Sequence, residues 1–419
     1  MDRLARRLGV PDAVVIGLGS MLGAGVFVVF GPAAAAAGGA GLLPALVLAG
    51  FVAFCNATSS ARLAARYPES GGTYVYGRER LGPLAGFVAG WGFVVGKTAS
   101  CAAMALTIGA YLWPGQARLV AVGAVLAVTG VNLRGIGKTA TVTKLLVALV
   151  LAVLALVAVV GVVGGPVHLD RLGDPGDPGG SARGVLTAAG LLFFAFAGYA
   201  RIATLGEEVR DPRRTIPRAV PLALGVVLAI YLVLAVVTLG VLGADRLAGS
   251  AAPLVDVVTA AGLPGLAWVV RAGATIAVVG VLLSLVAGVG RTTLAMARRR
   301  DLPGALAAVH QVHQVPHRAE LAVAAVVIVV VLLGDVRDAI GFSSCTVLVY
   351  YAITNAAALT LGRERERERE RKLPVQVLAG LGLVGCLLLA VNLPLGSVLA
   401  GFGVLAAGVA WYALRAARR

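Results

Sequence analysis

Long apolar stretches recur along the whole chain and are separated by short polar segments. A helix that crosses a lipid bilayer needs about 20 mostly apolar residues, and twelve stretches meet this criterion. The predicted spans cover residues 13–36, 41–64, 83–111, 117–133, 142–164, 185–207, 218–242, 265–296, 319–334, 338–361, 374–391 and 394–413. The hydrophobic pattern therefore predicts an all-α polytopic membrane protein with about twelve transmembrane helices.

Basic residues alternate between the polar segments. The segments after the second, fourth, sixth, eighth and tenth predicted spans are rich in arginine and lysine, whereas the segments between them hold few. Because arginine and lysine collect on the cytoplasmic side of a membrane, we expect a multi-pass plasma-membrane protein with both termini in the cytoplasm. An odd number of spans would spoil this alternation, which supports twelve.

The first predicted span carries four glycines within nine residues, Gly17, Gly19, Gly23 and Gly25. Glycine costs about 0.8–1 kcal/mol relative to alanine inside a helix, so this helix can break at its middle. Non-helical backbone is tolerated in a membrane only where it lines a cavity within the protein. The amides freed at a half-helix N-terminus suit an anion such as a carboxylate, which makes this stretch a candidate binding site.

A second interruption lies in the sixth predicted span, where aromatic residues precede Gly198 and Arg201 follows it. Broken helices at matching positions of two halves are typical of transporters built from inverted repeats. The predicted organisation is a cytoplasmic N-terminus 1–12, a first repeat 13–164, an extracellular loop 165–184, a second repeat 185–361, a charged cytoplasmic loop 362–373, peripheral helices 374–414 and a cytoplasmic C-terminus 415–419.

Composition agrees with a membrane protein. Of the 419 residues 59% are hydrophobic and 13% are charged, whereas soluble domains carry about 25% charged residues. The net charge of +16 is spread over short clusters between apolar runs, so membrane orientation explains it better than a nucleic-acid partner does. All four cysteines lie in apolar runs, which indicates buried thiols without a disulfide or metal framework.

Polar side chains within the spans are candidates for coupling transport to an ion. Lys97 lies near the middle of the third span, where a charge faces a cavity or a partner. A lysine held by neighbouring carbonyls is about equally compatible with that position. Ser284 could serve a cation, although such a hydroxyl commonly bonds the carbonyl four residues earlier. No nucleophile, base and metal set suggests an enzyme, and we expect neither a cofactor nor a metal.

Four motifs together resemble the amino acid–polyamine–organocation (APC) superfamily of permeases. They are GSMLGAGVF (19–27), YPESGGTYVY (67–76), FFAFAGYARIATLGEEVRDPRRTIPRA (193–219) and GRTTLAMARRRDLP (290–303). The sequence is most similar to bacterial relatives of the cationic amino acid transporter branch. The resemblance implies a LeuT-like fold, with two five-helix inverted repeats, broken helices 1 and 6, and two peripheral helices. It also implies a secondary transporter that moves an amino acid by alternating access, with H+ coupling or exchange both open.

The resemblance further implies a substrate site. Backbone amides of the first helix would hold the α-carboxylate, carbonyls of the sixth helix would hold the α-amino group, and Phe194 matches an aromatic gate. The implied binding residues are Met21, Leu22, Gly23, Ala24, Gly25, Phe194, Ala195, Phe196, Ala197 and Gly198. The coupling candidates are Lys97, Arg201 and Ser284.

Two positions depart from the pattern of the relatives. Val150 stands in the fifth span where some proton-coupled relatives have a lysine, so coupling through such a lysine is in doubt. Ala200 and Arg201 follow the sixth-helix break, where many relatives carry an acidic residue. A dibasic substrate would lack a counter-ion there, which favours neutral or small amino acids. A membrane sensor that binds an amino acid without transporting it, and a polyamine or organic amine transporter, are the alternatives.

Overall fold

The computed structural model describes residues 8–67, 71–135, 140–164, 167–172, 181–203, 209–363 and 373–417, which are almost entirely helical. The α-helices are α1 (Val10–Met21), α2 (Ala24–Val28), α3 (Phe30–Arg66), α4 (Thr73–Leu81), α5 (Pro83–Leu112), α6 (Ala117–Leu133), α7 (Ala140–Val163), α8 (Ala182–Phe196), α9 (Ala200–Ala203), α10 (Pro212–Leu242), α11 (Ala244–Gly249), α12 (Pro253–Ala260), α13 (Ala267–Arg298), α14 (His317–Leu333), α15 (Val336–Arg363), α16 (Leu373–Val391) and α17 (Leu395–Ala416). Most of the predicted loop 362–373 and part of the loop 165–184 lie outside the described residues.

The predicted membrane class is confirmed. Within the described ranges, ten helical stretches are long and apolar enough to cross a membrane. The predicted spans 319–334 and 374–391 correspond to α14 and α16. The four cysteines are free and buried, as expected.

The order of elements repeats in the two halves of the chain. Each half opens on an interrupted helix, α1–α2 in the first and α8–α9 in the second. Each then continues through four further spans, α3, α5, α6 and α7 in the first half and α10, α13, α14 and α15 in the second. The fourth span of each repeat has the same 17-residue length. This order is the arrangement expected for two five-helix repeats.

A sharp corner joins the first two spans. The backbone runs helically from Phe30 to Arg66, except at Gly38, whose φ of 62° and ψ of −166° interrupt the run. Only glycine adopts this backbone conformation readily, because it has no Cβ. The corner at Gly38 therefore ends the second half of the first span and starts the next one.

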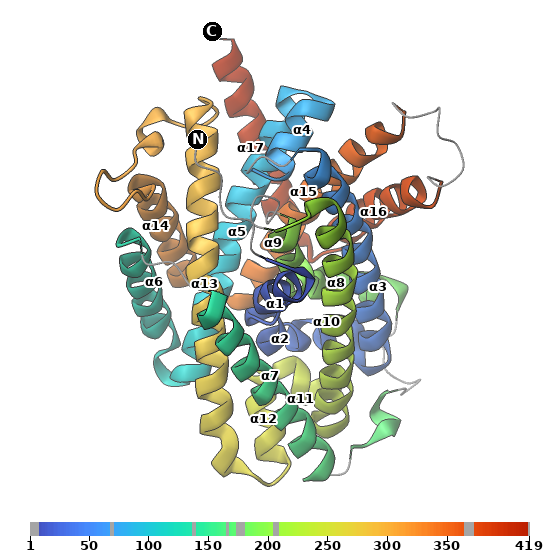
Figure 1. The fold of residues 1–419 in the computed structure, drawn as a ribbon. Helices are drawn as coiled ribbons and strands as arrows, with labels where there is room; N and C mark the ends of the chain where they lie inside the picture. The colour runs from blue at the N-terminus through green and yellow to red at the C-terminus, as the bar shows by residue number, and fades with distance from the viewer. Residues whose placement is uncertain are drawn as a thin grey trace.

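The interrupted helices lie at the centre of the molecule. Figure 1 shows α1 and α2 in the middle of the bundle, between α13 on one side and α8 on the other. α8 packs against α3, α1 packs against α10, and α5 packs against α13 and α15. α16 and α17 add to this core from outside, on α15, α3 and α5. The surrounding helices therefore hold the two interrupted helices, α1–α2 and α8–α9, inside the bundle.

A polar cluster at one end of the bundle joins two of the sequence motifs. The Tyr74 hydroxyl donates to Asp301 Oδ2 at 2.6 Å, and Arg78 lies 3.3 Å from the same oxygen. The Arg299 guanidinium stacks over the Tyr74 ring, with 5.6 Å to its centroid. Burial and the Asp301 carboxylate both raise the pKa of Tyr74, so this hydroxyl stays protonated and remains a donor. The cluster connects α4 to the segment that follows α13.

Replacing Asp301 with asparagine is expected to lower the free energy of unfolding by about 1–3 kcal/mol. The Asp301 side chain is only 4% exposed, so its loss leaves the hydroxyl of Tyr74 and the guanidinium of Arg78 with a weaker acceptor. Thermal unfolding of the purified protein measures the change. Asp211→Asn is the matched control, because its pair with Arg214 is largely exposed and such pairs contribute little. Equal shifts would show that the cluster adds nothing beyond a surface pair.

Candidate functional site

The first span breaks at the place that its glycines predict. α1 ends at Met21, and Leu22 and Gly23 leave helical geometry with ψ values of 48° and −141°. α2 then starts at Ala24, and Val29 has helical dihedral angles, so the helical direction continues into α3. The first amides of a helix lack an intrahelical acceptor. The break therefore presents backbone donors within a buried part of the membrane domain.

The second break is milder than the first. α8 ends at Phe196, a 3-10 turn (η4, Ala197–Tyr199) follows, and α9 resumes at Ala200. The dihedral angles of Phe196, Ala197 and Ala200 stay close to helical values. A 3-10 turn pairs residues three apart and changes the direction in which carbonyls point. The sixth span is thus interrupted by tightening rather than by unwinding.

The two breaks contact each other through residues without bulky side chains. A Cβ added at Gly25 would lie 2.5 Å from Ala195 Cα in α8. A Cβ added at Gly198 would overlap the Ser20 carbonyl group and lie 2.8 Å from Met21 N. Backbone therefore meets backbone at two points, and the structure brings the predicted residues of both spans into one place. All of those whose side chains are described are buried except Gly198, which is half-buried.

Tyr231 of α10 is a residue of this region that sequence reasoning missed. Its hydroxyl donates to Met21 O at 2.7 Å and to Ala195 O at 3.1 Å, one carbonyl from each broken span. Its ring packs edge-on against Phe30 and Phe196. Within the apolar pattern of its span, a single tyrosine carries no signal that separates it from an ordinary core residue.

A small cavity of about 30 Å³ lies beside the first break. Its lining residues include Leu22 of the break, Gly19 of α1, Val150 and Thr143 of α7, and Val281 of α13. None of the described residues that line it is charged. Val150, the position compared above with the lysine of some proton-coupled relatives, therefore has apolar surroundings. A volume of this size matches about one water molecule.

The three coupling candidates do not line this cavity. Lys97 is buried in α5, one helical turn from Cys101. Ser284 is exposed, and its hydroxyl donates to Gly280 O at 3.3 Å, the bond to a preceding carbonyl expected for a helical serine. Arg201 is exposed on α9. The structure therefore places only Lys97 in a buried setting.

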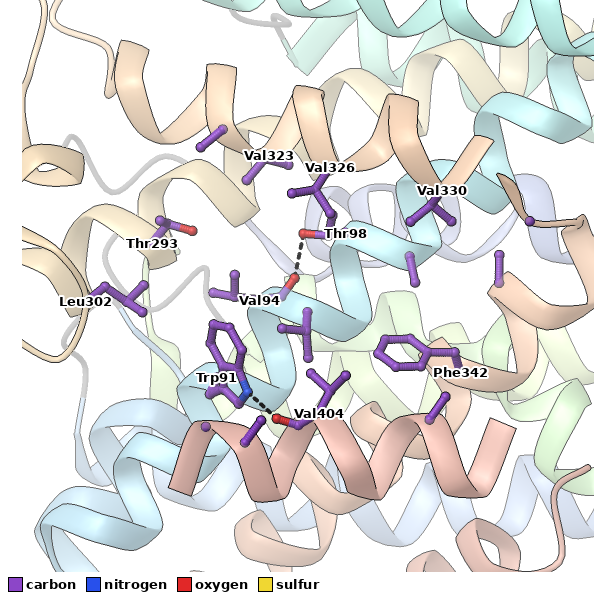
Figure 2. Close-up of a pocket in the computed structure, with 18 of the residues that line it drawn as sticks. Trp91, Val94, Thr98, Thr293, Leu302, Val323, Val326, Val330, Phe342 and Val404 are labelled. Atoms are coloured by element: carbon purple, nitrogen blue, oxygen red, sulfur yellow. Dashed lines mark hydrogen bonds between the residues drawn. The ribbon is translucent and has the colours of Figure 1, made fainter. Parts of the chain in front are cut away.

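A larger hollow of about 950 Å³ lies away from the breaks, among α5, α14, α15 and α17. Figure 2 shows apolar side chains around it, with Trp91 and Val94 on one wall and Val326 and Val330 on another. The Trp91 indole donates to Val404 O at 2.9 Å, which ties α5 to α17. Its lining is mostly apolar and includes the carboxylates of Asp335 and Asp338, but among the described residues it holds no basic side chain that could pair with an α-carboxylate, so we do not assign the substrate to it.

Broken first helices in two repeats, packed backbone to backbone at the centre of a membrane domain, define a transporter of the inverted-repeat class. The sequence profile "Amino acid permease" matches residues 12–412. The chain belongs to the amino acid permease family, within the APC superfamily.

Individual relatives agree with this assignment. An uncharacterized transporter of Mycobacterium tuberculosis is 60% identical over 417 residues, covering 99% of this chain and 92% of the relative. The branched-chain amino acid permease BcaP of Bacillus subtilis is 28% identical over 93% of this chain and 88% of its own length. The crystal structure of MhsT in complex with L-phenylalanine has a TM-score of 0.67 at 16% identity, covering 94% of this chain and 99% of MhsT. This last likeness confirms the LeuT-like fold.

Proposed function

We propose that this permease carries a neutral amino acid across the plasma membrane by alternating access, with both termini cytoplasmic. The observation that carries the proposal is the crossing of the two broken spans, where Gly25 faces Ala195 and Gly198 faces the backbone of Ser20. Amides at the start of α2 would hold the α-carboxylate, and carbonyls near the end of α8 would hold the α-amino group. Phe194, which is 8% exposed, would act as the outer gate.

The surroundings of the breaks favour a substrate with an uncharged side chain. The cavity beside the first break is lined by valine, leucine, alanine, glycine and threonine. A cationic side chain buried there would lack a counter-ion, and burying an unpaired charge is strongly unfavourable. The similarity to BcaP, which is named a branched-chain amino acid permease, supports the same substrate class.

The tight packing around the breaks supports a mechanism of alternating access. A cavity of about 30 Å³ has room for about one water molecule, far less than an amino acid requires. The substrate would therefore enter only when the half-helices separate from α7 and α13 on one side or the other. Rocking of one helix bundle against the other supplies such an opening without unfolding any span.

Binding and flux together test this function. We expect purified protein to gain thermal stability with leucine, isoleucine or valine, because a ligand that binds the folded state stabilises it by mass action. Proteoliposomes should then accumulate or exchange the same amino acid. Binding without flux would identify a sensor instead of a transporter. Stabilisation by polyamines alone would exclude carboxylate recognition by α2.

Lys97 is the coupling candidate that lies in a buried setting. It is 8% exposed within α5, and among the described residues no carboxylate lies within ion-pair distance of it. A buried unpaired amine in a membrane span is a candidate for a functional proton site. Lys97→Met is expected to flatten the pH dependence of uptake while leaving amino acid exchange intact. Arg118→Met is the control, because Arg118 is exposed and its hydrogen bond to Gly334 O, at 3.4 Å, is exposed as well; an unchanged pH profile in Lys97→Met would make the lysine structural.

A further inference from the structure

The hollow of about 950 Å³ at the side of the bundle has no part in the proposed function. Figure 2 shows α14 and α17 on opposite sides of it, with side chains of α5 between them. Both helices pack on α5. Val326 of α14 and Trp411 of α17 line the hollow and are 52% and 46% exposed. The hollow is therefore a groove that opens outwards between two helices of the membrane domain.

The groove has the length and the lining of a site for lipid chains. Its wall on α17 runs from Gly396 to Trp411, and at 1.5 Å per residue this stretch of helix is about 22 Å long. The hydrocarbon core of a bilayer is about 30 Å thick, so the chains of one leaflet cover most of the groove. Ala400 and Ala407 on the same wall leave room between the larger side chains.

Apolar contact alone does not select one lipid for this groove. Lipid tails are as apolar as leucine side chains, so placing them against a membrane helix yields packing contacts without a hydrophobic driving force. The headgroup must therefore supply the preference, and the two ends of the groove differ in charge.

One end of the groove carries an arginine beside a tryptophan. The Arg415 guanidinium lies over the Trp411 ring, 5.9 Å from its centroid, and its Nη1 donates to Leu302 O at 3.2 Å. Trp411 Nε1 donates to Asp301 O at 3.4 Å, so both side chains are held at this end. Among the described residues no carboxylate lies within ion-pair distance of Arg415. Arginine has five N–H donors, and those that remain suit a phosphate.

The opposite end of the groove is acidic. Asp335 and Asp338 line it, and both are exposed. Arg337 lies between them in the chain but donates to a carbonyl of α11 instead. Arg118 contacts Gly334 O nearby, at 3.4 Å, and two carboxylates outweigh this single charge. An anionic headgroup is therefore disfavoured at this end and favoured at the other.

We propose that the groove binds an anionic phospholipid, with its phosphate at Arg415 and its acyl chains along α17. The lipid comes from the leaflet on the side of the C-terminus, which is the cytoplasmic leaflet in the proposed orientation. Basic sites between membrane helices on that side are suited to anionic headgroups. The groove lies away from both broken spans, so the site is independent of the amino acid that the protein carries.

Binding of defined lipids to delipidated protein in a neutral detergent tests the proposal. Native mass spectrometry should show phosphatidylglycerol bound about tenfold more tightly than phosphatidylcholine with the same chains, because the choline cation offsets the phosphate charge. Arg415→Gln should reduce this preference to about threefold or less. Arg218→Gln is the matched control, because Arg218 is an exposed arginine of α10 that does not line the groove, and it should keep the native preference.

A second variant tests the groove separately from the headgroup. Ala400→Phe places a ring in the groove and should weaken binding of both lipids by about tenfold. Ala406→Phe adds the same ring at an exposed position of α17 outside the groove, and it should bind both lipids as the native protein does. Thermal unfolding without lipid checks that each variant folds.

Four results would overturn the inference. They are equal native affinity for the two lipids, a native preference in Arg415→Gln, native affinity in Ala400→Phe, and a dimer that forms without lipid and is disrupted by Ala400→Phe. The last result would make the groove an interface between two copies of the chain.

Discussion

Gly198→Ala is expected to abolish amino acid binding while the protein still inserts and folds. The added methyl group would overlap the Ser20 carbonyl and lie 2.8 Å from Met21 N. These neighbours are backbone atoms of α1, so no rotamer change can make room for the methyl group. Overpacking typically costs about 1–3 kcal/mol, occasionally more. Since the strain falls between the two breaks, we expect a loss of affinity of about a hundredfold or more.

Gly225→Ala is the matched control for this variant. Gly225 lies in α10, and a Cβ added there would meet no atom within 4 Å, so its binding should equal that of the native protein. Size-exclusion profiles of both variants in detergent check that folding is retained. Native affinity in Gly198→Ala would show that the close approach of α1 and η4 is not required for binding, and the site assignment would then fail.

The position of the first break could be predicted from the sequence for a local reason. Gly23 immediately precedes α2 and Gly25 faces α8, and both glycines stand out in an otherwise apolar helical run. Helix propensity and the demand for backbone partners in a membrane act on neighbouring residues. Both effects can therefore be assessed from the local sequence without knowledge of the fold.

The form of the second break could not be predicted in the same way. Residues around Gly198 keep near-helical dihedral angles, so propensity alone does not separate a 3-10 turn from a continuous helix. What fixes this turn is the contact of Gly198 with α1, which is 178 positions distant in the chain at Ser20. Such a contact follows from the fold and has no local signature.

Tyr231 and Asp301 illustrate the same limit for side chains. Tyr231 bonds carbonyls 210 and 36 positions away, and the Asp301 carboxylate accepts from Tyr74, 227 positions away. The motifs that contain Tyr74 and Asp301 were recognised separately, but nothing in either stretch says that they meet. Pairings of this kind depend on how the two repeats are packed, which the hydrophobic pattern does not specify.

Gly23→Val is expected to remove amino acid binding and to leave membrane insertion normal. A Cβ at this position would lie 2.8 Å from Cγ2 and 3.1 Å from Cβ of Val281 in α13, and the two methyl groups of valine add further bulk. The branched side chain would also cover the amides at the start of α2 that we assign to the carboxylate. The loss of binding is measured as a smaller increase in thermal stability when the substrate of the native protein is added to the variant. Gly123→Val, where an added Cβ meets nothing within 4 Å, should bind normally.

A double variant separates the two causes of this loss. In Gly23→Val with Val281→Ala, the neighbour in α13 is truncated, so the clash between the two helices is relieved while the branched side chain still stands over the amides. Binding that returns in the double variant would make the packing of α13 against the break the requirement. Binding that stays absent, with thermal stability restored, would indicate that the substrate itself must approach the backbone at Gly23. Native affinity in the single variant would contradict the assignment of the carboxylate site to this break, because no bound carboxylate could tolerate a valine there.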